Sequence, residues 1–230
     1  MSVSTFIENA AFSKVIAGIV IPNRDGLVGE FFMGGNEDSS IRNIAGGPPL
    51  VAVGTPIYND GYVYMEGGGY GDNRFDTQIS PTSSSDETII VILKRHLNDY
   101  PASCHSSSFS GLFNYNKQTA YYNGQGGSLS NVADVPPPPT GGPDFYMTAG
   151  AGEFAQLGEA HSWESGVRTT AIAEVVGGNR PTAPYKFCNS TGRCNYAYFA
   201  IFNRKLEVAE LDIVYANAKT FLASRGVTLS

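Results

Sequence analysis

Aromatic and polar side chains occur together in three turn-like segments of the sequence, GGGYGDNRF (67–75), EAHSWESG (159–166) and PTAPYKF (181–187). A sugar-binding site needs aromatic faces that stack on the sugar ring and polar side chains that bond to its hydroxyls. The side chains that could form such a site are Tyr70, Asp72, Asn73, Arg74, Trp163 and Tyr185. Each aromatic ring could instead pack against a sheet or helix, which is the commoner role for any one of them.

A calcium ion would need hard oxygen ligands from neighbouring turns. Asp72, Asn73 and Asp76 are close enough in sequence to supply them. The alternative is that all three are solvated turn residues. The three histidines lack the spacing of a metal site, so no cofactor other than calcium is expected.

Hydrolytic chemistry has little support in the sequence. A glycosidase needs two carboxylates that face the scissile bond from one surface. The nearest acidic cluster is Glu207, Glu210 and Asp212, which lies at the start of a predicted helix. Acids in the first turns of a helix compensate its dipole. No segment resembles a nucleophile elbow, so we expect a protein that is not an enzyme.

The bulk composition excludes several classes of partner. The chain has 230 residues and a net charge of −6, with no basic run. We therefore do not expect it to bind nucleic acid. No stretch of 18 apolar residues is present, so membrane insertion is not expected. The N-terminus lacks the basic start of a signal peptide. Three cysteines are too few for a disulfide scaffold.

The middle of the chain consists of short apolar segments separated by Gly, Pro and Asn turns, a pattern typical of an all-β domain. Residues 87–96 (ETIIVILKRH) are β-branched and almost continuously apolar, which predicts a central strand covered on both faces. Asn59-Asp60-Gly61 predicts a hairpin turn. A second hairpin is predicted around Cys188 and Cys194, where the two cysteines either form a disulfide or remain thiols.

The two ends of the chain differ from its body. Residues 207–225 predict a helix that docks through one apolar stripe and ends at Gly226. The stripe consists of Leu211, Val214, Tyr215, Ala218 and Leu222. Residues 1–22 predict an N-terminal arm that contacts another subunit or protein, because VIAGIVIP is too apolar to stay exposed. Residues 23–230 are expected to form a single domain.

The closing segment resembles that of the concanavalin A-like, laminin-G-like jelly-roll domains common in bacterial and bacteriophage proteins. The matching residues are Ile201-Phe202-Asn203-Arg204, Leu206, Glu210 and Arg225-Gly226. Glu207 departs from the pattern, because those domains often have Ser or Asp there as the helix cap. DGLVGEFF, ETIIVILKR and TTAIAEVVGGN resemble the family's opening, central and penultimate strands. The resemblance covers residues 25–226 and implies a jelly-roll sandwich with a C-terminal amphipathic helix.

The same resemblance implies functions that the fold alone does not separate. Domains of this kind with an N-terminal arm look like bacteriophage virion proteins, so we expect a non-catalytic tail-fibre, receptor-binding or decoration protein. It would be made in the host cytoplasm, would form a homo-oligomer, and would bind host-surface carbohydrate or other virion proteins. The alternatives are a structural assembly module without a glycan site and a glycan-cleaving enzyme. The E-x-D-x-x-E strand of the family's β-glucanases is absent.

Overall fold

The computed structural model describes part of the chain. The described residues are 21, 23–66, 73–80, 86–95, 104–107, 110–115, 118–123, 133–135, 145–153, 157–164, 166–174, 183–187 and 193–230. In the segments between 104 and 135 only the backbone is described.

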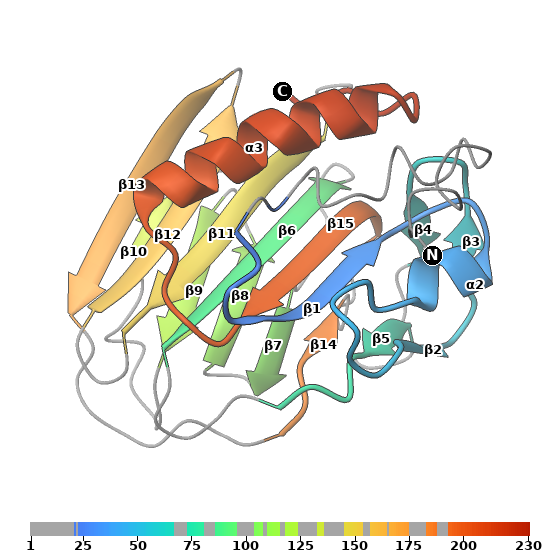
Figure 1. Cartoon of the computed structure of the whole chain (residues 1–230), viewed down its shortest axis with the longest axis horizontal. Helices are drawn as coiled ribbons and strands as arrows, with labels where there is room; N and C mark the ends of the chain where they lie inside the picture. The colour runs from blue at the N-terminus through green and yellow to red at the C-terminus, as the bar shows by residue number, and fades with distance from the viewer. Residues whose placement is uncertain are drawn as a thin grey trace, which may run out of the picture.

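The described strands form two antiparallel sheets (Figure 1). The helix-side sheet has the order β13 (Val167–Glu174), β12 (Leu157–Glu164), β11 (Tyr146–Gly152), β6 (Glu87–Arg95), β15 (Cys194–Phe202), β4 (Val63–Met65) and β3 (Ile57–Tyr58), with β1 (Leu27–Phe32) also paired to β15. The outer sheet has the order β10 (Ala133–Val135), β9 (Gln118–Asn123), β8 (Ser110–Tyr115), β7 (Cys104–Ser107), β14 (Lys186–Phe187), β5 (Arg74–Asp76) and β2 (Val51–Val53). A short helix, α2 (Glu37–Ile41), follows β1, and a long helix, α3 (Val208–Ala223), follows β15.

Strand β6 confirms the prediction of a central strand covered on both faces. Ile89, Val91 and Leu93 face the core between the two sheets. Ile90 and Ile92 point the other way, into a second core beneath α3. Successive side chains of a strand point to opposite faces, so a strand buried on both sides must be apolar throughout. All five side chains are fully buried.

Helix α3 lies across the face of the helix-side sheet that points away from the outer sheet (Figure 1). The predicted stripe is the buried one, with Phe221 added to it: Leu211, Val214, Tyr215, Ala218, Phe221 and Leu222. At the start of the helix, the backbone N–H of Glu207 donates to the Glu210 carboxylate at 3.0 Å. The Glu210 carboxylate thereby accepts from a backbone N–H at the helix start, where no preceding helical turn supplies a carbonyl.

The turn between β3 and β4 is the hairpin predicted at residues 59–61, because Ile57 pairs with Tyr64 and Tyr58 with Val63. The turn packs against the end of α3, where Arg225 donates to the carbonyl of Asp60 at 2.9 Å. A Cβ at Gly61 would lie 2.5 Å from Cγ2 of Val227. This close approach explains why glycine stands there.

The hairpin predicted around Cys188 and Cys194 is wrong. Strand β14, on one side of that segment, pairs with β5 and β7 in the outer sheet. Strand β15, on the other side, pairs with β6, β4 and β1 in the helix-side sheet. Every residue of β15 is buried, whereas Lys186 of β14 is only partly buried. Cys194 is buried with Sγ 3.3 Å from the Lys94 carbonyl, and Cys188 lies outside the described residues.

Ile21 is the one residue of the predicted arm, residues 1–22, that the structure describes. It is 1% exposed and belongs to the core beneath α3. The end of the arm therefore packs against its own domain. Residues 1–20 and 22 lie outside the described residues, so the contact of the arm with another protein stays a prediction.

The fold is therefore a jelly-roll-like, all-β sandwich with a C-terminal helix, as the sequence predicted. No helix among the described residues is long and apolar enough to cross a membrane.

Replacing Leu211 with Asp tests the docking of α3. The side chain is fully buried, so the change removes apolar contacts and buries a carboxylate. We expect the free energy of unfolding to fall by about 3 kcal/mol or more. The matched control is Ala216→Asp on the same helix, because Ala216 is exposed. Equal effects of the two variants in urea denaturation would show that α3 is not docked through Leu211.

Candidate binding surface

Trp163 lies in β12 beneath α3 and is 1% exposed. Its ring stacks on Tyr215 with centroids 5.9 Å apart, and its Nε1–H donates to Asp212 at 3.2 Å. A ring covered in this way has no open face for a sugar. The alternative role named from the sequence, packing against the terminal helix, is the one the structure gives to Trp163.

Tyr185 is also buried, with 2% of its surface exposed, in the core between the sheets. Its hydroxyl donates to the carboxylate of Glu87. Its backbone carbonyl accepts from the amide of Thr77 at 3.1 Å, which joins the segment before β14 to the end of β5. The assignment of Tyr185 to a sugar site is thus corrected, because its polar end is used inside the protein.

Asn73 holds two neighbouring loops together. Its Oδ1 accepts from the backbone N–H of Thr55 at 3.1 Å, and its Nδ2 donates to the carbonyl of Glu66 at 3.0 Å. Asn73 is therefore placed to position β5 more than to contact a ligand. Tyr70 and Asp72, the other candidates in this segment, lie outside the described residues.

Arg74 and Asp76 point away from the core on the outward face of β5. They form a bidentate ion pair, with Nε 2.8 Å from Oδ1 and Nη2 3.2 Å from Oδ2. Each side chain is about a quarter exposed. Phe75 between them faces the inter-sheet core and is fully buried, so strand alternation directs its two neighbours outward.

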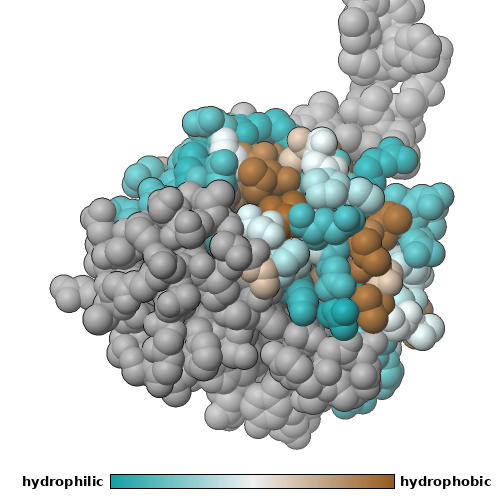
Figure 2. All heavy atoms as spheres, turned by 90° about the horizontal axis from the view of Figure 1, so that it is seen from below, coloured by the Kyte–Doolittle hydropathy of each residue, from teal (hydrophilic) through white to brown (hydrophobic). Residues whose placement is uncertain are grey.

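The register of the outer sheet extends this outward face over three strands. Asp76 is paired with Lys186 of β14 on one side and with Val51 of β2 on the other. Val51 is 46% exposed. We call the outward positions of these strands the β5 surface: Val51, Val53, Arg74, Asp76 and Lys186. Figure 2, which views the molecule from below, shows apolar groups lying between hydrophilic ones among the described residues.

Gln78, just after β5, has a left-handed backbone conformation with φ of 57°. This conformation is uncommon for residues other than glycine and is found most often at turns and functional sites. The Gln78 side chain donates to the carbonyl of Pro49 at 3.0 Å. That bond links the end of β5 to the segment before β2 and so fixes the rim of the β5 surface.

The predicted calcium site gains no additional ligands from the fold. Both oxygens of Asp76 are bound by Arg74, which competes with any cation. Among the described residues, no group of three or more His, Cys, Asp and Glu side chains is placed to hold a metal ion. Because Asp72 lies outside those residues, the calcium site stays a prediction.

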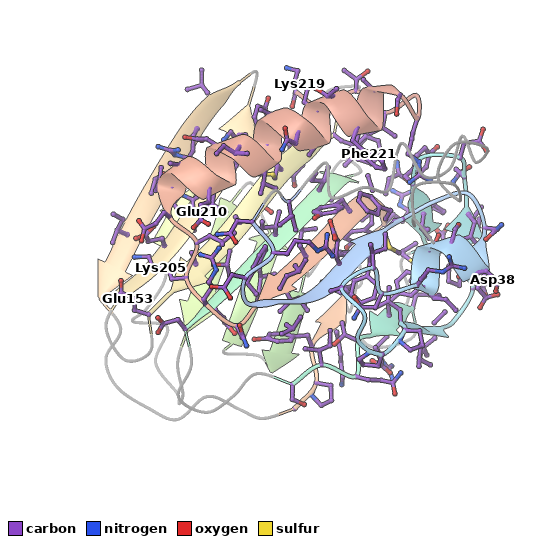
Figure 3. The ribbon with its side chains drawn as sticks, viewed as in Figure 1. Asp38, Glu153, Lys205, Glu210, Lys219 and Phe221 are labelled. Carbon is purple, nitrogen blue, oxygen red and sulfur yellow. The ribbon has the colours of Figure 1, made fainter. Side chains whose placement is uncertain are left out.

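A second polar cluster lies where β15 passes into α3, and sequence reasoning missed it (Figure 3). Lys205 Nζ lies 2.7 Å from Glu159 Oε1 and 3.1 Å from Glu153 Oε1. Burial lowers the pKa of Lys205, but its bonds to the two carboxylates outweigh burial and raise it. Glu159 also lies 3.1 Å from His161 Nε2, and His161 Nδ1 lies 2.9 Å from the Thr170 hydroxyl.

The hydrogen bond from His161, with further help from Lys205, lowers the pKa of Glu159 to about 2 against the opposing effect of burial. Ionised Glu159 can only accept, so Nε2 of His161 donates to it and Nδ1 accepts from the Thr170 hydroxyl in the neutral ring. A general acid needs a raised pKa at this kind of carboxyl. A lowered pKa does not suit that role, and the bonds of the cluster join β12 and β13 to the segment before α3.

This cluster could not be found from spacing, because its members come from the end of β11, from β12 and from the segment after β15. Only the alternation of Glu159, His161 and Trp163 along one strand is visible in the sequence. The alternation predicts that these three side chains lie on one face of the strand. It does not predict that Lys205 binds to Glu159 on that face.

No protein-family model matches the sequence, and no curated protein is similar to it at a significant level. Solved structures do resemble the fold. The binding domain of Paraclostridial mosquitocidal protein 1 aligns with a TM-score of 0.60 and 13% identity, over 85% of this chain and 52% of that one. The binding domain of botulinum neurotoxin DC, solved in complex with SialylT, aligns with a TM-score of 0.59 and 11% identity, over 88% and 52%.

A sialidase from Trypanosoma rangeli aligns with a TM-score of 0.59 and 13% identity, over 90% of this chain and 34% of the sialidase. The chain thus spans about half the length of the toxin binding domains and about a third of the sialidase. At identities this low the likeness establishes the β-sandwich fold alone.

The lowered pKa of Glu159 predicts that the folded protein loses stability in acid. A carboxyl whose pKa is lowered on folding contributes stability above its unfolded pKa, and that contribution disappears as pH falls through the folded pKa. For Glu159 the window runs from its ordinary pKa of 4.5 down to about 2. The difference corresponds to at most ~3 kcal/mol.

Urea denaturation of the wild type and of Glu159→Gln between pH 6 and pH 2 measures this contribution. Glu159→Gln should be less stable at pH 6 and should approach the wild type near pH 2. Asp38→Asn, an exposed change on α2, is the control and should follow the wild type. A constant difference between wild type and Glu159→Gln at every pH would contradict the assignment.

Proposed function

We propose that this protein is a non-catalytic carbohydrate-binding component of a bacteriophage particle, and that the β5 surface contacts the glycan. The observation that carries the proposal is the outward Arg74–Asp76 pair, flanked across the sheet by Lys186 and Val51. A guanidinium and a carboxylate donate to and accept from vicinal hydroxyls. An exposed aliphatic side chain beside them covers the C–H face of a sugar.

The charge of this surface favours an acidic sugar. Arg74 and Asp76 neutralise one another, and Lys186 adds one positive charge, in a chain whose net charge is −6. No ion pair of Lys186 with another described residue is present. A carboxylate or sulfate on the glycan would pair with Lys186, which no acidic side chain among the described residues neutralises. One of the structurally similar toxin domains was solved in complex with SialylT, which supports an acidic glycan by analogy of fold only.

The cluster around Lys205 supports the proposal that the protein is not an enzyme. The carboxylates of Glu153 and Glu159 share one ammonium group, and the pKa of Glu159 is lowered to about 2. The virion part rests on the resemblance of the chain to jelly-roll domains with an N-terminal arm, which look like bacteriophage virion proteins. Mass spectrometry of purified particles tests it, because the chain should be present in stoichiometric amounts.

A second candidate is an assembly module without a glycan site. The observation in its favour is the burial of Trp163 and Tyr185, which removes two of the three aromatic rings suggested for stacking. Blank glycan arrays together with presence in the particle would favour this candidate over the first.

Lys186→Ala tests the β5 surface. Loss of one charged contact should weaken binding of an acidic glycan roughly tenfold, and binding of neutral glycans much less. Lys219→Ala is the matched control, because it removes one lysine from the exposed side of α3, in a different layer. Binding is measured on a glycan array and then by calorimetry on the best ligand. Equal losses in the two variants would place the site elsewhere.

A further inference from the structure

Strand β13 has one edge that no other described strand pairs with. All eight of its residues, Val167–Glu174, pair with β12 in continuous register without a bulge. Among the described residues, no strand covers the backbone N–H and C=O groups on the opposite edge of β13 (Figure 1, far left). Such an edge is a template for adding another strand.

Few features of the β13 sequence protect that edge. Natural edge strands are commonly protected by charged side chains, proline or a bulge; residues 167–174 contain no lysine, proline or bulge, and their charged residues are Arg168 and Glu174. The two most exposed large apolar side chains of the described chain both belong to β13: Val167 at 68% and Ile172 at 62%. Arg168 is charged but is already paired with Asp212 of α3.

We propose that β13 pairs with β13 of a second copy of this chain, antiparallel and about a two-fold axis at Thr170. Two-fold pairing keeps the helix-bearing faces of both copies on one side, so only residues of the same face can lie opposite one another. The register through Thr170 satisfies this and uses almost the whole strand. It sets Thr170 opposite Thr170, and Arg168 of each copy opposite Ile172 of the other.

This register suits an identical partner. The aliphatic part of Arg168 covers the exposed Ile172 of the other copy. Each Thr170 hydroxyl keeps its bond to His161 of its own copy. The two arginines lie four residues apart along the joined strands, which is about 13 Å, and each keeps its own Asp212. No like charges therefore face each other.

The start of α3 enlarges the contact. Asp212 of α3 contacts both Trp163 of β12 and Arg168 of β13, so this end of the helix lies over the edge of the sheet. The next residue, Ile213, is 47% exposed. Joining two copies at β13 brings both helix starts to the same side of the junction, where apolar side chains add area to a strand pair that would be small by itself.

Sedimentation velocity of the full chain over a range of concentrations tests the pairing. The wild type should dimerise. Ile172→Lys should raise the dimer dissociation constant by at least about tenfold, because lysine then faces Arg168 of the other copy. Ile57→Lys on β3 is the matched control, since Ile57 is 52% exposed on the opposite edge of the same sheet. It should leave the dimer unchanged.

The register has a test of its own. Thr170→Cys should form an inter-copy disulfide under mild oxidation, whereas the wild type, with its native cysteines, should not, and Thr169→Cys should cross-link much less. A wild type that stays monomeric, a dimer that Ile57→Lys breaks and Ile172→Lys spares, or equal cross-linking of the two cysteine variants would overturn the proposal. If the wild type is monomeric, the β13 edge would instead be available to a strand of a different protein.

Discussion

Burial of the helix-side sheet on both faces is the constraint on which the rest of the structure depends. β6 and β15 lie at its centre, with one core between the sheets and the other beneath α3. Every residue of β15 is buried. The core beneath α3 exists only because α3 covers that face of the sheet, so the helix is an integral part of the fold. This also explains why an otherwise all-β chain ends in a helix: an apolar outer face needs a cover, and the following segment supplies it.

Double burial also decides where polar side chains can lie. Within β12, Glu159 and His161 face the same layer as α3, and they persist there because Lys205 and Thr170 complete their bonds. Buried charges are tolerated when they are paired and hydrogen-bonded. The surfaces that we propose for a glycan and for a second copy are the β5 surface and the edge of β13. They belong to different sheets and share no residue.

The fold by itself is compatible with more than one function. Toxin binding domains and a sialidase share the sandwich at 11–13% identity, so the same layers support binding and hydrolysis. What distinguishes these functions is the chemistry at particular positions. Here His161 and Lys205 lower the pKa of Glu159, while Arg74, Asp76 and Lys186 lie at outward positions of the outer sheet.

The sequence by itself determined the elements whose patterns are local. The continuous apolar run of β6, the Asn59-Asp60-Gly61 turn and the stripe of α3 each follow from the spacing of neighbouring residues, and all three were predicted. The tertiary structure alone decided which sheet each strand joins, because pairing depends on residues far apart in the chain. For that reason β14 and β15 were wrongly predicted as a hairpin. It also decided exposure: Trp163 and Tyr185 have the residue types of a sugar site, but α3 covers one and the inter-sheet core encloses the other. The Lys205 cluster combines side chains from the end of β11, from β12, from β13 and from the segment after β15, and their spacing along the chain does not predict this contact.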